Sequence, residues 1–479
     1  MTDIDLTDID LSELRQQLPG KRWFGGKGRA LLALELLDAA VLDEGPEDLI
    51  VALVRVRFEE GASQLYHLPL LVTPEGRARD ALDDPSRLGA LGRLMAHGQT
   101  VKGARGAFHF GGPGLDPMAP PGTTVRAIGA EQSNSSVVLD DAVIVKLFRR
   151  VEPGPNPELE LNRALTTEGF EHVPPHVGEA QYEGSWDGDD VTIDLAFAQA
   201  FVHDAADGWE AFVAQVRALM DQIHEADAFE DLRYLTEERA APSLEAAERL
   251  GDASAALHVA LAREELAPEL APEPIDASDL KEWAESAHAS LRRLVRAGDF
   301  GLGALEEEIE ARLDRLTAIA DAGLKTRVHG DLHLGQTIRT PERWLILDFE
   351  GEPLRPLEVR RAKQSPLRDV AGMLRSFSYA AAAVLLERTQ PGSHERARLT
   401  PWAETWEELA RERFLHAYLR SAHEGRFLAE RRDDLAVMLD VFEIDKALYE
   451  IDYERSHRPD WIGIPLHGIA KVVERGALR

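Results

Sequence analysis

The feature that most constrains the fold is a change of pattern close to residue 204. Before it, short stretches rich in Val, Ile and Leu are separated by turn residues, which is typical of antiparallel strands. After it, long runs carry apolar residues at three- and four-residue spacing, which predicts amphipathic helices. At 479 residues the chain exceeds the size that one hydrophobic core supports. We therefore predict an α+β fold with more than one domain.

The patterns divide the chain into three parts. Residues 1–90 form a small α+β unit, and residues 91–203 form a β-rich lobe with one helix that starts near Asn156. Residues 204–479 form a helical lobe that contains one short strand pair. The expected strands cover residues 31–41, 49–58, 65–72, 124–128, 135–139, 143–148, 177–182 and 191–201. The expected long helices include residues 243–264, 277–297 and 305–321.

Composition excludes several classes of function. The 54 Lys and Arg residues against 85 Asp and Glu residues give a formal net charge of −31. Such a surface repels nucleic acid and anionic lipid, so we expect neither as a partner. The absence of cysteine excludes disulfides, thiolate metal sites and a cysteine nucleophile. The first residues do not resemble a signal peptide, and no apolar run approaches the ~18 residues of a membrane span, so we expect a cytoplasmic protein.

The strongest chemical motif lies in the strand pair of the helical lobe. His329-Gly-Asp331 is followed by Gln336, and an apolar strand then ends in Asp348-Phe-Glu350. Phosphoryl transfer needs one carboxylate beside the incoming hydroxyl, and it needs amide and carboxylate oxygens for Mg²⁺. The order of these residues therefore predicts a phosphoryl-transfer site.

A second motif lies upstream, in the β-rich lobe. Lys146 lies on the predicted strand 143–148, and Glu160 follows in the first turn of the next predicted helix. In kinases, a lysine on a strand forms an ion pair with a glutamate on the following helix. This lysine binds the phosphates of ATP. The two motifs together are more specific than either alone.

This order of motifs resembles the aminoglycoside-phosphotransferase branch of the protein-kinase-like fold. Within that branch the chain closely resembles the bacterial maltokinases, and the similarity extends over essentially the whole chain. The resemblance implies a two-lobed kinase-like fold with an N-terminal cap. It is carried by Arg22-Trp23 and by residues 132–136, 148–150, 156–157, 329–336, 348–353, 365–377 and 458–461.

The resemblance assigns roles residue by residue. Asp331 would accept or orient the proton of the sugar hydroxyl, and Gln336, Asp348 and Glu350 would bind Mg²⁺. Lys146, positioned by Glu160, would bind the α- and β-phosphates of ATP. The backbone of Ser133, Asn134, Ser135 and Ser136 would cover the phosphates, and adenine would bind near Gln199, Phe201 and Val202. Two departures from the wider kinase pattern are Gln336 in place of asparagine and a phosphate loop without glycine.

The activity that the resemblance implies is transfer of the γ-phosphoryl group of ATP to the anomeric hydroxyl of maltose. The product, maltose 1-phosphate, would serve α-glucan (glycogen) synthesis, and some maltokinases assemble with trehalose synthase. The acceptor would lie against the helical lobe. The candidate substrate residues are His329, Glu352, Lys446, Tyr449, Glu450 and Tyr453.

Several alternatives remain open from the sequence. Glucosamine or an aminoglycoside is a possible acceptor for the same site, and an inactive pseudokinase that binds trehalose synthase is a hypothesis of another class. His329, Asp331 and His333 occupy alternate positions of one segment, which share a face when the segment is extended. This pattern is also typical of the metal ligands of a hydrolase. His329 is also typical of a structural histidine, and the spacing of the two tyrosines is what helix packing produces. We expect Asp369 to cap a helix and tether the catalytic loop, and His258 to lie in the core.

Overall fold

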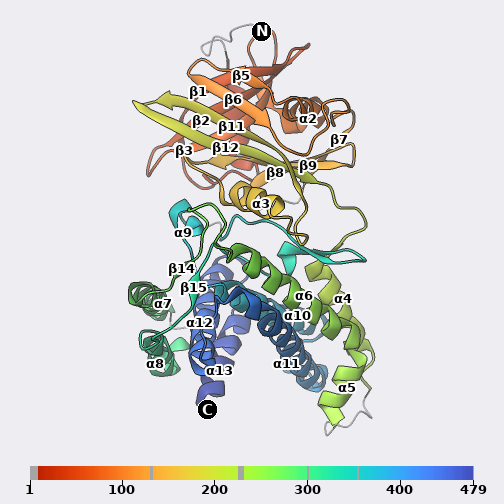
Figure 1. Cartoon of the computed structure of the whole chain (residues 1–479), viewed down its shortest axis with the longest axis vertical. Coiled ribbons are helices and arrows are strands. Elements are labelled where there is room, and N and C mark those ends of the chain that lie inside the picture. Colours follow the sequence, from red (N-terminus) through yellow and green to blue (C-terminus); the bar gives the residue numbers. More distant parts are fainter. Residues whose placement is uncertain (1–8, 130–132, 225–230, 299–300, 353–354, 478–479) are drawn as a thin grey trace. The chain divides into compact units, whose positions relative to one another are not determined.

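The computed structural model describes residues 9–129, 133–224, 231–298, 301–352 and 355–477 (Figure 1). The chain divides into two compact units, Met1–His203 and Asp204–Arg479. The division falls where the sequence pattern changes from strands to helices. We describe each unit by itself.

The first unit contains two antiparallel sheets. After helix α1 (Ser12–Gln17), one sheet has the order β1-β2-β3-β10, and β4 pairs with β3. Its strands are β1 (Leu31–Asp43), β2 (Asp48–Phe58), β3 (Gln64–Val72), β4 (Ala78–Asp80) and β10 (Arg150–Val151). The expected strands of this region are thus present, and they differ from the predicted bounds by only a few residues.

The second sheet has seven strands in the order β5-β6-β11-β12-β9-β8-β7. They are β5 (Thr100–Lys102), β6 (Gly106–Gly111), β7 (Val125–Ile128), β8 (Asn134–Leu139), β9 (Val143–Phe148), β11 (His176–Trp186) and β12 (Asp189–Ala200). The sequence did not predict β5 and β6, which are short and bounded by glycine. Helix α2 (Gly89–Ala96) precedes this sheet, and α3 (Pro157–Thr167) follows β10.

One hydrophobic core joins the two sheets of the first unit. Leu49 and Val51 of β2 belong to the same buried cluster as Phe108 of β6 and Tyr182 of β11. A second cluster, which includes Trp23, lies within the first sheet and its flanking segments. The boundary that we expected near residue 90 therefore does not separate two independent cores.

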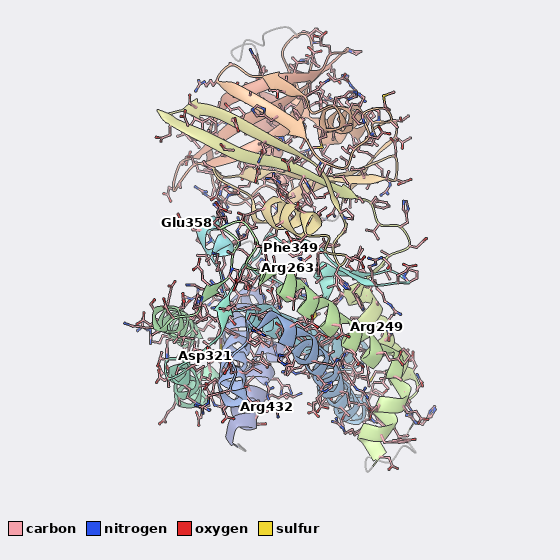
Figure 2. The ribbon with its side chains drawn as sticks, in the orientation of Figure 1. Arg249, Arg263, Asp321, Phe349, Glu358 and Arg432 are labelled. Carbon is pink, nitrogen blue, oxygen red and sulfur yellow. The ribbon has the colours of Figure 1, made fainter. Side chains whose placement is uncertain are left out.

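The second unit is built from long helices. They are α4 (Gly208–Asp221), α5 (Leu232–Arg239), α6 (Ala241–Leu261), α7 (Ala277–Gly298), α8 (Glu306–Leu316), α9 (Leu357–Arg361), α10 (Leu367–Arg388), α11 (His394–Ala422), α12 (Arg432–His457) and α13 (Gly463–Ala477). Phe212 of α4 packs against Phe377 of α10 and Trp406 of α11, with ring centroids 5.4 and 6.5 Å away. Charged side chains such as Arg249 and Arg432 lie on the outside of this unit (Figure 2).

Helix α10 is the core helix of the second unit. It is the one described helix that is long and apolar enough to cross a bilayer, but 78% of its apolar window is buried inside the protein. Such burial is what a core helix of a globular domain requires.

Short strands hold the catalytic motif in this unit. A three-stranded sheet has the order β13-β16-β17, formed by β13 (Ala206–Asp207), β16 (Thr337–Arg339) and β17 (Trp344–Ile346). A separate pair consists of β14 (Glu273–Pro274) and β15 (Leu324–Lys325). We expected one strand pair, and β16–β17 is that pair; the other strands are too short to leave a pattern in the sequence.

Candidate active site

Helix α10 anchors the loop that carries His329 and Asp331. The carboxylate of Asp369, which is 1% exposed, accepts hydrogen bonds from the backbone N–H groups of His329 (2.7 Å) and Gly330 (2.9 Å). Burial favours a raised pKa for Asp369, but the hydrogen bond from His258 and nearby positive charge outweigh it and lower the pKa. Because α10 begins at Leu367, Asp369 lies in its first turn and is not the cap that we expected. The tether to the loop is confirmed by the two backbone bonds.

Close packing of backbone helps to define this loop. Gly330 has a φ of +82°, a conformation that a residue with a side chain rarely adopts. On α10, a Cβ atom at Gly372 would lie 2.6 Å from the carbonyl oxygen of Leu332. A side chain at Gly372 would therefore push the loop away from the helix, and one at Gly330 would strain the backbone of the loop.

His329 is a structural residue of the loop. Its ring is buried, Nε2 lies 2.7 Å from the carbonyl oxygen of Leu347, and Nδ1 accepts from the backbone N–H of Asp331 at 3.3 Å. Both ring nitrogens are thus used inside the protein, and the prediction of His329 as a substrate residue is wrong. The metal-ligand triplet is contradicted as well, since neither ring nitrogen of His329 is left to bind a metal ion.

Asp331 forms a partly buried ionic cluster with residues from two other segments. Nζ of Lys446, on α12, lies 2.9 Å from Oδ1 of Asp331 and 2.8 Å from Oε1 of Glu352. Nε of Arg355 lies 2.5 Å from Oε2 of Glu352. Sequence reasoning named Asp331, Glu352 and Lys446 as site residues, but it did not predict that they contact one another.

The contact keeps both Asp331 and Lys446 ionised. Burial would raise the pKa of Asp331, but the charge of Lys446 outweighs burial and lowers it. Burial would lower the pKa of Lys446, but the charges of Asp331 and Glu352 raise it well above the usual value. At neutral pH the site therefore presents a carboxylate at Asp331 that is held by an ammonium group.

The other predicted residues of α12 are placed differently. Tyr449 lies beside the cluster, with its ring centroid 5.0 Å from Nζ of Lys446. Glu450 instead forms a buried ion pair with Arg375 at 2.9 Å. Tyr453 stacks on His457, with ring centroids 4.3 Å apart. Tyr453 lies seven residues beyond Lys446, which is about 10 Å along a helix. Although both residues share one face of α12, Tyr453 is therefore too far along the helix to lie beside Asp331.

The predicted metal ligands lie on two hydrogen-bonded segments. Nε2 of Gln336 donates to Oδ2 of Asp348 at 3.2 Å, and the backbone N–H of Leu347 donates to the carbonyl oxygen of Gln336 at 2.9 Å. Asp348 has a φ of +64°, an uncommon conformation for a residue with a side chain that often marks a functional position. Glu350 follows two residues later, where its carbonyl oxygen accepts from Arg360 at 3.0 Å. Amide and carboxylate oxygens are the ligands that Mg²⁺ prefers, so these residues fit that ion.

The predicted ion pair of the first unit forms with a different glutamate. Nζ of Lys146, on β9, lies 2.6 Å from Oε2 of Glu158, which is 2% exposed. We expected Glu160 in this position. Residues two apart on a helix point to different faces. Because Glu158 points toward β9, Glu160 points to another face of α3. Asn156 fixes this turn, because its side chain accepts from the backbone N–H of Glu158 at 2.9 Å.

The predicted phosphate loop is partly a strand. Asn134, Ser135 and Ser136 belong to β8 and are buried, and Oγ of Ser135 accepts from Nε of Arg149 at 2.9 Å. The hydroxyl of Ser135 is therefore used within the protein. Ser136 is the cross-strand partner of Lys146, so the two side chains share one face of the sheet. Ser133 is exposed at the start of this strand, and Gln132 lies outside the described residues.

The predicted adenine segment ends the first unit. Gln199 lies on β12, where it is paired with Ile144 of β9. Phe201 and Val202 follow the strand, and the backbone N–H of Phe201 donates to the carbonyl oxygen of Ala142 at 2.8 Å. The segment is thus hydrogen-bonded to the turn just before β9, the strand that carries Lys146.

Asp331 opens into a pocket of the second unit, which we call the inner pocket. It has a volume of about 210 Å³. Arg368 in its wall pairs with Asp445 at 2.8 Å and lies over the ring of Phe442 at 4.8 Å. The lining residues include Trp283, Val328, Asp331, Glu352, Gln364, Arg368, Phe442, Asp445 and Lys446. Sequence reasoning missed Trp283 and Gln364, for which no local motif exists.

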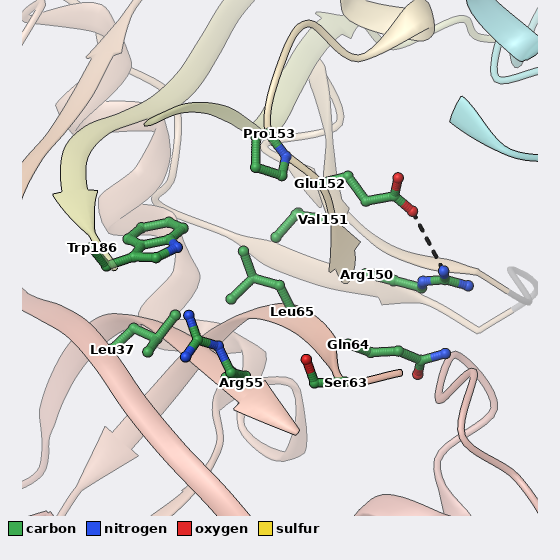
Figure 3. Close-up of a pocket in the computed structure, with 10 residues that line it drawn as sticks. All are labelled: Leu37, Arg55, Ser63, Gln64, Leu65, Arg150, Val151, Glu152, Pro153 and Trp186. Atoms are coloured by element: carbon green, nitrogen blue, oxygen red, sulfur yellow. Dashed lines mark hydrogen bonds and ion pairs between the residues drawn. The ribbon is translucent and has the colours of Figure 1, made fainter. Parts of the chain in front are cut away.

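The first unit has a separate pocket of about 380 Å³ (Figure 3). Trp186, Leu37 and Leu65 form apolar parts of its wall, and Arg150 and Glu152 form an ion pair of 3.4 Å at one side. None of the predicted site residues lines this pocket. We assign no role to it.

Comparisons with known proteins add to this geometry. Residues 18–101 match the family model of the maltokinase N-terminal cap domain. A glucosamine kinase of Mycolicibacterium smegmatis is 28% identical over 73% of this chain and 80% of its own length. A glucosamine kinase of Streptacidiphilus jiangxiensis is 29% identical over 72% of this chain and 73% of its own length.

Solved structures of glucosamine kinases have the same fold. One crystal form is 25% identical, covers 92% of this chain and 91% of its own, and has a TM-score of 0.66. A complex with glucosamine, ADP and inorganic phosphate is 24% identical, covers 97% and 99%, and has a TM-score of 0.68. The predicted fold class, a β-rich N-terminal part with a cap and a helical C-terminal part, is confirmed. The predicted class of enzyme, a phosphotransferase with an alcohol group as acceptor, is confirmed by the same relatives.

Proposed function

We propose that this protein is an ATP- and Mg²⁺-dependent sugar kinase that phosphorylates the anomeric hydroxyl of maltose. The observation that carries the proposal is the position of Asp331. It lies on an anchored loop, in the wall of a pocket, and is held as a carboxylate by Lys446. A group placed in this way can orient a sugar hydroxyl and accept its proton as the phosphoryl group transfers.

Each predicted part of the machinery has a role in the proposal. Asp331 orients the acceptor hydroxyl, and Lys446 keeps that carboxylate ionised and in place. Gln336, Asp348 and Glu350 offer the oxygen ligands for Mg²⁺, which neutralises phosphate charge when it is bound.

The nucleotide role belongs to the first unit. Lys146, held by Glu158, binds the α- and β-phosphates, and the proposal replaces Glu160 by Glu158 as the positioning carboxylate. Adenine lies along the segment of Gln199, Phe201 and Val202. The backbone near Ser133 and the face shared by Ser136 and Lys146 are the remaining phosphate contacts.

The charges of the inner pocket favour a neutral acceptor. Asp331 and Glu352 share Lys446, and Asp445 pairs with Arg368. A cationic sugar would have to compete with these cations for the carboxylates. Maltose has no charge and uses hydroxyl groups, which bind beside such paired groups without displacing them.

Glucosamine is the second candidate acceptor. It is favoured by the two relatives, both named glucosamine kinase, and by the solved complex that contains this sugar. The same catalytic residues would serve it, and the difference would lie in the pocket wall. An assembly with trehalose synthase stays a prediction.

The test is an ADP-release assay with Mg-ATP and maltose, glucosamine, glucose or an aminoglycoside, with phosphorus NMR of the product. We expect maltose to give a 1-phosphate and Asp331→Asn to abolish it. Turnover of glucosamine alone would keep the site and change the acceptor. Binding of ATP without turnover of any acceptor would support the pseudokinase hypothesis.

A further inference from the structure

A buried hydrogen-bond network continues from Asp369, the anchor of the loop, into the helical core. Nε2 of His258, on α6, lies 3.1 Å from Oδ2 of Asp369. Nδ1 of the same ring lies 2.7 Å from the hydroxyl oxygen of Tyr418, on α11. His258 and Tyr418 are both 0% exposed. Helix α11 packs against both α6 and α10, which brings the three side chains together (Figure 1). Neither His258 nor Tyr418 belongs to the proposed catalytic machinery.

The two partners of His258 determine which ring nitrogen carries the proton. Burial favours protonation of Asp369, but its hydrogen bonds and nearby positive charge keep its pKa below the usual value, so the carboxylate only accepts. Burial raises the pKa of Tyr418 well above its usual value, so the hydroxyl keeps its proton. A ring with one proton therefore carries it on Nε2, which donates to Asp369, while Nδ1 accepts from Tyr418. With the proton on Nδ1 instead, two acceptors would face each other at Asp369.

Aromatic rings hold the imidazole of His258 in place. The ring of Tyr418 lies edge-to-face with it at 5.5 Å between centroids, and the ring of Phe427 does so at 6.1 Å. Phe414 stacks on Tyr418 with centroids 6.3 Å apart. Side chains that are close-packed in this way keep one rotamer. The N–H of His258 therefore points in one direction, toward Asp369.

The network reaches the loop through one carboxylate. Oδ2 of Asp369 accepts from His258 and from the backbone N–H of His329, and Oδ1 accepts from the backbone N–H of Gly330. The bond from His258 opposes rotation of the carboxylate, so both oxygens stay directed at the loop. Asp331 is the next residue along the chain. A misplacement of about 1 Å at a reacting group can cost about 100-fold in rate, so the orientation of Asp369 matters for turnover.

His258 and Tyr418 lie behind the wall of the inner pocket. Among the residues that the structure describes, the lining of this pocket includes Asp369 but neither His258 nor Tyr418. We propose that His258 and Tyr418 are positioning residues for phosphoryl transfer. Tyr418 fixes the proton of His258 on Nε2, and that N–H holds Asp369, which in turn places the loop that carries the reacting carboxylate. This inference rests on the proposed function, in which Asp331 orients the acceptor hydroxyl.

The experiment compares Tyr418→Phe with the matched control Tyr182→Phe. Tyr182 is also 0% exposed, and its hydroxyl donates to Asp38 at 2.8 Å in the first unit. The ADP-release assay uses Mg-ATP and maltose, or glucosamine if the wild type phosphorylates that sugar instead. We expect Tyr418→Phe to lower kcat about tenfold through loss of one hydrogen bond, with each KM changed less than about twofold. Tyr182→Phe should lose similar stability to urea but keep the wild-type kcat, which a purely structural role of Tyr418 would also produce in Tyr418→Phe.

A double variant tests the route through His258. His258→Leu removes both ring nitrogens and should lower kcat at least as much as Tyr418→Phe. Addition of Tyr418→Phe to His258→Leu should lower kcat no further, since no ring proton remains to be directed. His258→Gln keeps a side-chain N–H and should recover part of the kcat that His258→Leu loses. If His258→Leu does not fold, the comparison of Tyr418→Phe with Tyr182→Phe decides the proposal by itself.

The outcomes separate this inference from the proposed function. Unchanged kcat for Tyr418→Phe, or an equal loss for Tyr182→Phe, would overturn the positioning role while the kinase assignment stands. A further loss of kcat in the double variant would overturn the route through His258. If the wild type phosphorylates no sugar, the proposed function fails, and hydrogen exchange of residues 327–334, measured by mass spectrometry, decides the positioning role. Faster exchange in Tyr418→Phe than in the wild type and Tyr182→Phe would support it, and equal exchange would overturn it.

Discussion

Two partly buried lysines, one in each unit, show how differently ion pairs are built in this protein. Lys146 pairs with Glu158, which lies twelve residues away on the next helix. Lys446 pairs with Asp331 and Glu352, which lie 115 and 94 residues away. The first pair joins strand β9 to the helix that follows it, α3. The second pair joins α12 to the loop that carries Asp331. Local pairs of this kind leave a spacing in the sequence, and distant pairs leave none.

The difference predicts different consequences of losing each lysine. Loss of Lys446 leaves the carboxylates of Asp331 and Glu352 without their shared cation, where we propose that the acceptor hydroxyl binds. Loss of Lys146 leaves one carboxylate on the nucleotide side. The following predictions test this contrast, in order of expected effect.

The largest effect is expected for the carboxylate that Lys446 holds. Asp331→Asn keeps the shape of the side chain but removes the proton acceptor, so kcat should fall by about 10³-fold. ATP affinity, measured by calorimetry, should change little because Asp331 lies on the acceptor side in our proposal. A variant with nearly normal kcat would show that another group takes the proton.

Lys446→Met should damage both stability and the pH profile. The pair is partly buried, so removal of one partner should cost about 1–3 kcal/mol, and urea unfolding measures this loss. The pKa of Asp331, which Lys446 lowers, should rise. Activity needs the carboxylate, so it is present above this pKa and lost as pH falls through it. The acid limb of kcat against pH should therefore move to higher pH in the variant, and an unmoved limb would contradict the role of Lys446.

Lys146→Met should act mainly on the nucleotide. We expect KM for ATP to rise about tenfold with a smaller change in unfolding free energy than for Lys446→Met, since a phosphate contact is lost. Steady-state kinetics and urea unfolding of the two variants, measured together, provide the comparison. Equal effects of both variants on KM for ATP would remove the distinction between the lysines.

The choice between Glu158 and Glu160 sharpens the same contrast. Glu158→Gln removes the charge that contacts Lys146 and should raise KM for ATP by about five-fold. Glu160→Gln is the matched control, two residues away on the same helix, and its effect should be smaller. A larger effect of Glu160→Gln than of Glu158→Gln would support the pair of Lys146 and Glu160 that the sequence predicted.

The last prediction concerns stability and not catalysis, and it tests the effect of pH on the anchor of the loop. Hydrogen bonding in the folded state lowers the pKa of Asp369 below its usual value near 3.8. A lowered pKa contributes stability that is present above the unfolded value and is lost as pH falls through the folded value. Asp369→Asn should therefore lose about 1–2 kcal/mol at pH 7 and less at acid pH. Urea unfolding at several pH values measures this, and a loss that does not depend on pH would contradict it.

Much of the fold could be predicted because it depends on local patterns. The strand Val143–Phe148 has the bounds that alternation and the turn at Asp140-Asp141 indicate. Helix α3 begins after Asn156, as Pro157 and its acidic first turn predict. The short strands β5 and β6 were not predicted, since segments of three to six residues beside glycine show too little alternation of apolar and polar residues.

The candidate site could be predicted in part. Asp331, Gln336 and Asp348 lie in compact motifs, so their proximity follows from a short chain segment. The sequence suggested His329 as a substrate residue because it cannot reveal that both ring nitrogens bond within the loop. It named Glu160 because a spacing identifies a helical turn but does not decide which of two nearby carboxylates faces the strand.

The sequence by itself determined the change from strands to helices, the order of the chemical motifs and the residue types they contain. These depend on period, turn chemistry and short spacing, which act between neighbours. Only the tertiary structure decided that Lys446 contacts both Asp331 and Glu352, and that Trp283 and Gln364 lie in the wall of the pocket beside them. Such contacts arise when segments about a hundred residues apart pack together, and the ion pairs that they form keep Asp331 and Lys446 charged.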